Sequence, residues 1–413
     1  MKPLDIAIAG AGPAGLGAAL FLKRAGHGVT VFERFDAPKP LGSGLILQPT
    51  GLTVLSGLGL FDEIRTLGSR IDRLYGADAA SGRTVLDVRY GRKSDRFGVA
   101  VHRAALFGVL FRAVERENIR IETNTELSTL ETGERAWLLS ADGRRHGPFD
   151  LVVDASGSRS RLRSFARVPE EPRSLAYGAF WASLRWHGEG FDPHALTQRY
   201  RRAGVMIGVL PIGRASADGI EQAAFFWSLK PADAEAVKAS GLNAWKARVA
   251  GLWPATQPYL DQISDFDELT LARYGHHTLK FPAGRQLAVI GDAAHSTSPQ
   301  LGQGANMALL DAAALASALA GGGSVDEALE RYCSLRRWHV RTFQALSYVF
   351  TPFYQSDSVA LPFLRDWVVP TLARVPPAPG ILAAMVAGTL VDPLEPLGLK
   401  ERDWTLQAGL ATA

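Results

Sequence analysis

Apolar residues at the start of the chain follow the pattern of a buried strand, a helix and a second strand. Residues 4–9 form a short, mostly apolar run, which is typical of a strand buried on both faces. A helical segment follows to about Ala25 and is ended by Gly26. Residues 29–32 predict the second strand, which closes with Glu33. This order favours an α/β fold with a parallel sheet.

A second strand-to-helix transition lies roughly 300 residues further along the chain. The pattern predicts a strand at residues 286–290, a turn at Gly291-Asp292 and a helix from about Gln303. Such a strand delivers Asp292 to the edge of a ligand, and the helix N-terminus that follows suits negative charge. We expect the fold to bring this segment and the opening strand and helix together around one ligand with hydroxyl and anionic parts.

The residues between these two segments alternate in ways that predict mainly strands. From residue 172 to 271 aromatic residues gather in strand-like runs, which indicate an antiparallel sheet with one face available for a substrate. The predicted strands are a hairpin within 71–88 and runs at 99–101, 119–124, 136–140, 149–153, 177–186, 198–200, 205–210 and 223–229. The predicted helices are 104–117, 232–252 and 325–347, followed by a proline-rich apolar tail at 350–399.

The organisation that follows is a discontinuous dinucleotide-binding domain, a sheet domain and a C-terminal helical region. The predicted boundaries are 1–72, 100–171 and 272–325 for the first, 73–99 and 172–271 for the second, and 326–413 for the third.

Composition narrows the class of protein. The 413 residues carry a net charge of only +4, so a nucleic-acid partner is not expected. The single cysteine, Cys333, allows no intrachain disulfide and no cysteine-rich zinc site, which favours a reducing, cytoplasmic setting and predicts no metal. The apolar stretch 4–22 resembles a signal sequence in length, but Asp5 and its glycines argue against that reading.

The first glycine-rich segment, Gly10-Ala11-Gly12-Pro13-Ala14-Gly15, matches the dinucleotide-binding pattern GxGxxG. Its first glycine permits the tight turn, its second lets a diphosphate approach the backbone, and its third lets the helix pack on the strand. Glu33 follows at the distance of the acid that binds ribose hydroxyls. The pattern predicts a dinucleotide without separating NAD from FAD.

Together these motifs make the chain resemble the single-component FAD-dependent aromatic monooxygenases, which have the p-hydroxybenzoate hydroxylase fold. The matching motifs are Gly10 to Gly15 with Glu33-Arg34, Gly291-Asp292-Ala293-Ala294-His295 with Pro299, Gly302-Gln303-Gly304-x-Asn306, Asp311, and Val101-His102-Arg103. The resemblance implies a Rossmann-like FAD-binding domain, an antiparallel-sheet substrate domain and C-terminal helices.

The resemblance also implies a reaction and a set of site residues. NADH or NADPH would reduce FAD, and O2 would then form a flavin C4a-hydroperoxide that hydroxylates an electron-rich phenolic or heteroaromatic substrate. Pro299 and Gly302 are the expected catalytic positions. The expected FAD contacts are Gly10, Gly12, Pro13, Ala14, Gly15, Glu33, Arg34, Arg103, Gly291, Asp292, Gly302, Gln303, Gly304, Ala305 and Asn306. Phe180, Met206, Phe226 and Pro299 are the candidate substrate contacts.

One departure from the family pattern keeps alternatives open. Where the family carries Gly-Ala-Asp-Gly, this chain has Asp154-Ala155-Ser156-Gly157, which puts its contribution to nicotinamide binding in doubt. This departure supports one alternative, a flavin-bound binding protein without turnover, and an FAD-dependent reductase without oxygen insertion is the other alternative. The sequence is compatible with a monomer or a homodimer, and packing of the tail is favoured over peripheral membrane contact.

Overall fold

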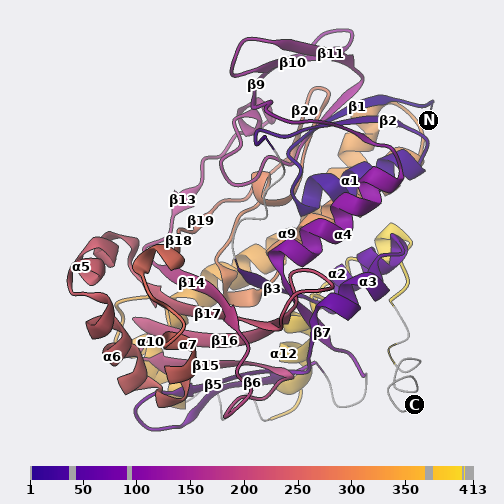
Figure 1. The fold of residues 1–413 in the computed structure, drawn as a ribbon. Coiled ribbons are helices and arrows are strands. Elements are labelled where there is room, and N and C mark those ends of the chain that lie inside the picture. The colour runs from indigo at the N-terminus through magenta and orange to yellow at the C-terminus, as the bar shows by residue number, and fades with distance from the viewer. Residues whose placement is uncertain (1, 37–42, 91–94, 368–374, 402–403, 405–413) are drawn as a thin grey trace.

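The computed structural model describes residues 2–36, 43–90, 95–367, 375–401 and 404. Two large sheets organise these residues (Figure 1). The parallel sheet lies in the upper part of the view with the N-terminal elements, and the second sheet lies below it. The expected mixed α/β architecture with antiparallel strands and C-terminal helices is confirmed. Residues 368–374 of the predicted tail, and residues 402–403 and 405–413 of the predicted C-terminal region, lie outside the described residues.

The upper sheet is parallel except at one edge. Within the described residues it has six strands, of which only β20 pairs antiparallel to its neighbour. The order is β20 (Ala283–Gly284), β21 (Leu287–Val289), β12 (Leu151–Asp154), β1 (Asp5–Ala9), β2 (Gly28–Phe32) and β8 (Arg120–Glu122). The two segments that are distant in sequence thus enter one sheet, with β12 between β1 and β21.

Both faces of this sheet are covered, which explains its continuous apolar strands. Ile6 and Ile8 of β1 pack with the helices α1 (Pro13–Arg24), α4 (Arg103–Arg116) and α8 (Gly304–Ala320). The alternate positions Ala7 and Ala9 face a three-stranded sheet, which contains β9 (Leu127–Glu131), β10 (Ala136–Ser140) and β11 (Arg145–Phe149). Strand β9 was not predicted.

The lower sheet corrects the expectation of purely antiparallel pairing. Its described strands run in the order β18 (Thr270–Ala272), β14 (Gly178–Arg185), β17 (Gln222–Leu229), β16 (Val205–Gly213), β15 (Ala195–Arg201), β5 (Arg73–Asp78) and β6 (Thr84–Arg89). Strands β15 and β5 pair parallel, because the predicted hairpin β5–β6 comes from an earlier part of the chain and joins the sheet at its edge. One face is covered by helices α5 (Ala234–Ala239), α6 (Leu242–Leu252) and α7 (Gln257–Leu260).

Two predicted helices have different limits in the structure. The helix expected at 232–252 is divided into α5 and α6, because Gly241 adopts φ +89° and interrupts the helical hydrogen bonds. The helix expected at 325–347 is α9 (Val325–Tyr354), which extends about two turns further. Ser324 and Glu327 form a capping box at its start.

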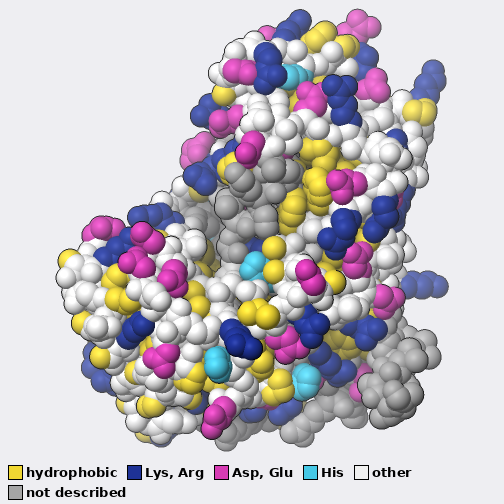
Figure 2. Space-filling view, in the orientation of Figure 1, with side chains coloured by type: hydrophobic (Ala, Val, Ile, Leu, Met, Phe, Trp, Pro, Cys, Tyr) yellow, Lys and Arg dark blue, Asp and Glu magenta, His cyan; other side chains and the backbone are white. Residues whose placement is uncertain are grey.

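The remaining described elements connect the two sheets or close one side of them. The connecting elements are β3 (Gly44–Leu47), β7 (Gly98–His102), β4 (Ser69–Ile71), β13 (Arg173–Ser174), β19 (Gly275–His276), α2 (Pro49–Gly57) and α3 (Phe61–Leu67). Helices α10 (Ala360–Trp367) and α12 (Ala378–Ala387) contact strand β6 at the edge of the lower sheet. No described helix has the length and apolarity needed to cross a bilayer. Acidic and basic side chains are interspersed on the face shown in Figure 2.

Candidate functional site

A single large cleft joins the two sheets. Its volume is about 1780 Å³, whereas pockets for drug-sized ligands measure roughly 300–1,000 Å³. Its walls come from the β1–α1 turn, the start of α8, the lower sheet and the C-terminal segment around Pro376 to Val386. The cleft therefore has room for a dinucleotide together with a second molecule.

The β1–α1 turn brings bare backbone to the cleft. Gly10 adopts φ +101°, and a Cβ there would lie 2.6 Å from the carbonyl oxygen of Ala155. A Cβ on Gly12 would meet no described heavy atom within 4 Å, because this residue faces open space. Gly12 is also the N-cap of α1, and no described side chain caps the helix there. The first N–H groups of α1 are thus open to an anionic group such as a diphosphate.

Glu33 lies beside this turn at the end of β2. Its carboxylate accepts hydrogen bonds from the backbone N–H groups of Ala11 (2.8 Å) and Phe35 (3.1 Å). Each carboxylate oxygen has a second lone pair, so Glu33 can still accept from the hydroxyls of a ribose. Arg34 lines the same part of the cleft.

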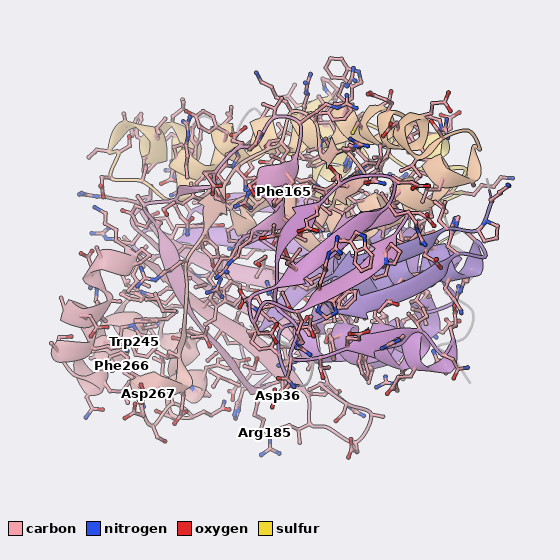
Figure 3. The ribbon with its side chains drawn as sticks, turned by 90° about the horizontal axis from the view of Figure 1, so that it is seen from above. Asp36, Phe165, Arg185, Trp245, Phe266 and Asp267 are labelled. Carbon is pink, nitrogen blue, oxygen red and sulfur yellow. The ribbon has the colours of Figure 1, made fainter. Side chains whose placement is uncertain are left out.

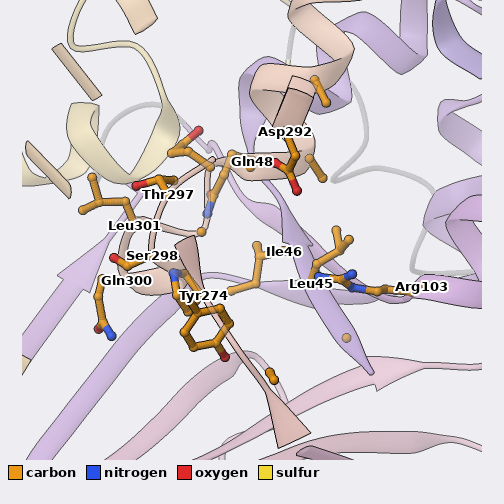
Figure 4. Close-up of a pocket in the computed structure, with 18 of the residues that line it drawn as sticks. Leu45, Ile46, Gln48, Arg103, Tyr274, Asp292, Thr297, Ser298, Gln300 and Leu301 are labelled. Atoms are coloured by element: carbon orange, nitrogen blue, oxygen red, sulfur yellow. The ribbon is translucent and has the colours of Figure 1, made fainter. Parts of the chain in front are cut away.

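The second glycine-rich segment supplies another open helix start. Gly302 adopts φ +60° just before α8, and Gln303, the N-cap of α8, makes no side-chain cap to the described residues. Asp292 projects into the cleft ahead of this helix (Figure 4). Although Asp292 is open to the cleft, desolvation by the surrounding walls raises its pKa, and neighbouring His295 and Arg103 oppose that rise. Two uncapped helix starts and two carboxylates therefore line one cavity.

Arg103 and Tyr274 lie where the cleft passes towards the lower sheet (Figure 4). The Tyr274 hydroxyl accepts a hydrogen bond of 2.8 Å from the indole N–H of Trp181. Burial raises the pKa of Tyr274 to about 12, against the opposing influence of Trp181 and Arg103. Tyr274 is consequently protonated at neutral pH, and its hydroxyl can donate a hydrogen bond into the cleft.

Most of the predicted site residues line this cleft. They are Gly10, Gly12, Pro13, Ala14, Glu33, Arg34, Arg103, Asp292, Pro299, Gly302, Gln303, Gly304 and Ala305 on the side of the parallel sheet, and Met206 and Phe226 on the side of the lower sheet. The motifs that the sequence separates by hundreds of residues are brought together here.

Three further predicted cofactor contacts, Gly15, Gly291 and Asn306, do not line the cleft. A Cβ on Gly15 would collide with the Gly10 carbonyl oxygen, so this glycine allows the helix to pack closely. Gly291 donates its N–H to Asp311 (2.8 Å). Asn306 is fully buried, where its side chain accepts from the backbone N–H of Gln48 and donates to the backbone oxygens of Ile46 and Gly302. All three residues thus hold the walls of the cleft in position.

The prediction that Phe180 contacts substrate is wrong. Phe180 is fully buried on the helix-covered face of β14, and its ring centroid lies 6.2 Å from that of Trp227. Trp245 and Phe266, which belong to the same core, lie side by side in Figure 3. Because side chains alternate along a strand, the next residue, Trp181, faces the cleft instead.

The segment that departs from the family pattern forms a compact turn. Asp154 is fully buried and accepts hydrogen bonds from the hydroxyls of Ser156 and Ser160. Ser160 in turn accepts from the backbone N–H of Arg163 (3.0 Å). Burial raises the pKa of Asp154, which these hydroxyls partly offset. The Ser156 hydroxyl therefore stabilises the turn, and Ser156 also lines the cleft.

Several lining residues were missed by sequence reasoning. They are Gln48, Trp181, Gln198, Tyr200, Tyr274, Phe350, Tyr354, Gln355 and residues of the segment 376–386. Because side chains alternate along a strand, Trp181 could have been predicted to face the cleft once the buried face of the strand was known. The C-terminal residues carry no local pattern that links them to the site. No cluster of three or more potential metal ligands occurs among the described residues.

The family described as "FAD binding domain" matches residues 3–345. This protein belongs to the FAD binding domain family. Among its relatives, the aurachin C monooxygenase/isomerase of Stigmatella aurantiaca is 27% identical over 368 residues, which are 88% of this chain and 93% of the relative. The FAD-dependent urate hydroxylase of Klebsiella pneumoniae is 26% identical over 345 residues, which are 81% of this chain and 86% of the relative.

Solved structures agree on the fold. The tetrameric form of 2-methyl-3-hydroxypyridine-5-carboxylic acid oxygenase has a TM-score of 0.77 at 21% identity, with 98% of this chain and 100% of that chain covered. Klebsiella pneumoniae HpxO complexed with FAD and uric acid has a TM-score of 0.76 at 20% identity, with coverages of 94% and 98%. As a member of this family, the protein uses FAD as its cofactor. Its two anionic phosphates and its ribose and ribityl hydroxyls suit the open helix starts and carboxylates described above.

Proposed function

We propose that this protein is a monooxygenase that uses NADH or NADPH and O2 to hydroxylate an electron-rich aromatic compound. One observation carries the proposal: the helix starts and carboxylates suited to FAD share one continuous cleft with an aromatic wall that includes Trp181 and Phe226. A ring bound against that wall would occupy the same cavity as the cofactor. Relatives that include a urate hydroxylase and a 3-amino-4-hydroxybenzoate 2-monooxygenase support the same reaction class.

The proposed roles follow from where the residues lie. The α1 start with Gly10, Gly12, Pro13 and Ala14 would bind the diphosphate, and Glu33 would bind a ribose. Asp292 would bind hydroxyls of the ribityl chain, with Arg34 and Arg103 as cationic neighbours. The α8 start at 302–305 would stabilise negative charge on the ring edge of the cofactor, and Pro299 would narrow the space beside it.

FAD supplies the redox chemistry, since it takes a hydride from the nicotinamide and passes electrons to O2. In the balanced reaction, one oxygen atom enters an aromatic C–H bond and the other leaves as water, while NAD(P)H and one proton are consumed. The task of the chain is to orient both molecules and to keep bulk water out of the cleft.

The test is oxygen incorporation by the FAD-loaded protein. NADH and NADPH oxidation would be followed in ¹⁸O2 with a panel of phenolic and heteroaromatic compounds, while hydrogen peroxide is quantified. We expect one compound to accelerate nicotinamide oxidation, to gain one ¹⁸O atom, and to keep peroxide well below the nicotinamide consumed. Full recovery of the nicotinamide as peroxide for every compound, or a product formed without O2, would contradict the proposal.

We further propose that the protein acts in the cytoplasm as a monomer or homodimer. The lone cysteine, Cys333, is buried, which suits a reducing compartment. One structural neighbour is described as tetrameric, so light scattering of the FAD-loaded protein is the appropriate test of assembly.

A further inference from the structure

Helix α10 presents apolar side chains to the surface of the protein. Val359, which precedes the helix, and Phe363 and Leu364 within it are exposed by 69%, 64% and 41%. Trp367 follows one turn later, and its ring stacks on that of Phe363 with centroids 5.9 Å apart. Because residues three or four positions apart lie on one side of a helix, these four residues form one outward surface, the α10 face.

The opposite side of α10 is buried and includes a cation. Pro362 and Arg365 are the buried residues of the helix. The Arg365 guanidinium donates to the Phe353 carbonyl at the end of α9 (2.9 Å) and lies over the rings of Tyr200 and Tyr354. A surface helix of a globular protein normally turns its apolar side inward and its charges outward. Helix α10 is thus anchored by a polar side chain and leaves its apolar residues at the surface.

The size of the α10 face sets it apart from single exposed apolar residues. Aromatic side chains measure roughly 150–250 Å² each, so two that are more than half exposed, with two aliphatic neighbours, make a patch on the order of 400 Å². Contiguous apolar patches of this size on a monomer typically mark a contact with a protein or a membrane. The α10 face therefore calls for an occupant.

Exposed arginines accompany the α10 face at this rim of the lower sheet. Arg83, in the β5–β6 turn, holds its guanidinium 3.3 Å from the centre of the Trp367 ring. The β15–β16 turn carries the exposed Arg202, and the Ala203 carbonyl of that turn accepts from the N–H of Ser356 (3.2 Å), just ahead of α10. Neither arginine forms an ion pair with an acidic residue in the described part of the chain.

The acidic residues near α10, in contrast, already have partners. Asp357 accepts from the Lys230 ammonium (2.7 Å), and Asp366 accepts from the Arg365 guanidinium (2.6 Å). Asp78 accepts hydrogen bonds within its own turn. The unpaired charge at this rim is therefore mainly positive, and an apolar face edged by cations is complementary to a bilayer with anionic head groups.

We propose that the α10 face docks reversibly onto a lipid bilayer that contains anionic lipids. Phe363, Leu364 and Trp367 enter the boundary between head groups and acyl chains, and Arg83 contacts lipid phosphates. A second copy of this chain fits less well, because a stable protein interface buries about 800 Å² on each partner and a two-fold contact adds no acidic side chain. The two residues that follow Arg83 on β6 line the cleft, so docking brings the cleft next to lipid. The inference does not depend on the proposed reaction.

The test is flotation of the FAD-loaded protein with vesicles of phosphatidylcholine alone or of phosphatidylcholine mixed equally with phosphatidylglycerol. We expect binding to the anionic vesicles that weakens as the salt concentration rises. The double variant Phe363→Ser, Leu364→Ser should bind them roughly tenfold or more weakly, because it loses two apolar side chains that enter the lipid. Arg83→Ser should bind them about fivefold more weakly, because it loses one cation near the head groups.

Ile220→Ser is the matched control. Ile220 is also an exposed apolar residue, but it lies in the β16–β17 turn, at the other end of β16 from the turn that contacts the segment ahead of α10. This variant should bind anionic vesicles as tightly as the unaltered protein. FAD content and thermal midpoint of all variants verify that they fold.

A fluorescent label tests directly which surface meets the lipid. The only cysteine of the chain, Cys333, is buried, so a single introduced cysteine can be labelled with a polarity-sensitive dye. A dye attached in Ala360→Cys, at an exposed position of α10, should emit at shorter wavelength when anionic vesicles are added. A dye attached in Ile220→Cys should not respond.

Three results would overturn the inference: no binding of the unaltered protein to anionic vesicles, equal losses of binding in Ile220→Ser and in the double variant, or unchanged emission of the dye in Ala360→Cys. Light scattering provides a fourth. A dimer that ignores vesicles and dissociates in the double variant would also overturn the inference and would assign the α10 face to a second copy of the chain.

Discussion

The two halves of the cleft are built from different parts of the polypeptide. The half on the parallel sheet presents backbone: a glycine turn, two uncapped helix starts and short acidic side chains at strand ends. The half on the lower sheet presents side chains, among them Trp181, Phe226 and Gln355, from strands and helices far apart in sequence. Backbone sites need glycine at fixed spacings, whereas side-chain walls accept many residue types. The first half can therefore be recognised from a sequence motif, whereas the second cannot.

A buried ionic network joins α8 to α9 and gives the largest expected effect. Asp311 accepts from His295 (2.6 Å) and from the Arg336 guanidinium (2.7 Å) on α9. Burial alone would raise the pKa of Asp311, but His295 and Arg336 hold it well below its usual value. Arg336→Leu leaves this carboxylate without its cation, so the free energy of unfolding should fall by about 3–5 kcal/mol. Urea denaturation measures it. As a control, Arg337→Leu at the neighbouring, exposed position should change the free energy of unfolding by less than about 0.5 kcal/mol.

Adjacent residues on β14 distinguish the two faces of the lower sheet. Phe180→Ala should lower the free energy of unfolding by about 3–5 kcal/mol, because it opens a cavity in the helix-covered core. Trp181→Phe removes the indole that donates to Tyr274, so it should cost only about 1 kcal/mol and should act mainly on substrate-dependent NAD(P)H oxidation. Equal losses of stability for both would mean that the faces are not distinct.

Asp292→Ala tests the backbone half directly. Loss of a carboxylate that accepts from FAD hydroxyls should weaken FAD binding by roughly tenfold to a hundredfold, with the fold intact. The dissociation constant is measured by titrating FAD into deflavinated protein. The control is Asp267→Ala, which removes an exposed carboxylate on the far side of the lower sheet (Figure 3). This variant should bind FAD normally. Full flavin content and unchanged turnover in Asp292→Ala would remove the role assigned to it.

The expected effect that is smallest at neutral pH lies at the junction of α9 with the C-terminal segment and grows as the pH falls. His339 accepts from Arg336 and donates to the Gly388 carbonyl, so it is held neutral, and burial lowers its pKa to about 3. The unfolded state takes up a proton near pH 6.5 and the folded state does not. Stability therefore falls as the pH drops from about 6.5 towards 3. Denaturation midpoints should fall less steeply over this range in His339→Gln, and equal slopes would exclude His339 as a source.

The extent of successful prediction differs between the halves for physical reasons. The glycine turn, Glu33 and Asp292 could be predicted because a local pattern dictates each conformation. Phe180 was assigned to the wrong face, because an apolar strand with both faces buried gives no polar alternation to mark its register. The cleft-lining positions Tyr354 and Gln355 could not be found, because they reach the cleft only through packing against segments distant in sequence. Gly241 divided a predicted helix that hydrophobic pattern alone would have continued.

The family match ends at residue 345, whereas Phe350, Tyr354, Gln355 and the segment from Pro376 to Val386 complete the cleft. Substitutions in this last part of the chain can reshape one wall without altering any residue that faces the diphosphate or ribose. During gene duplication and divergence, a change of substrate can thus proceed while the cofactor chemistry is inherited unaltered. The cleft-lining residues Phe350, Tyr354, Gln355 and those between Pro376 and Val386 are therefore positions at which selectivity can be engineered.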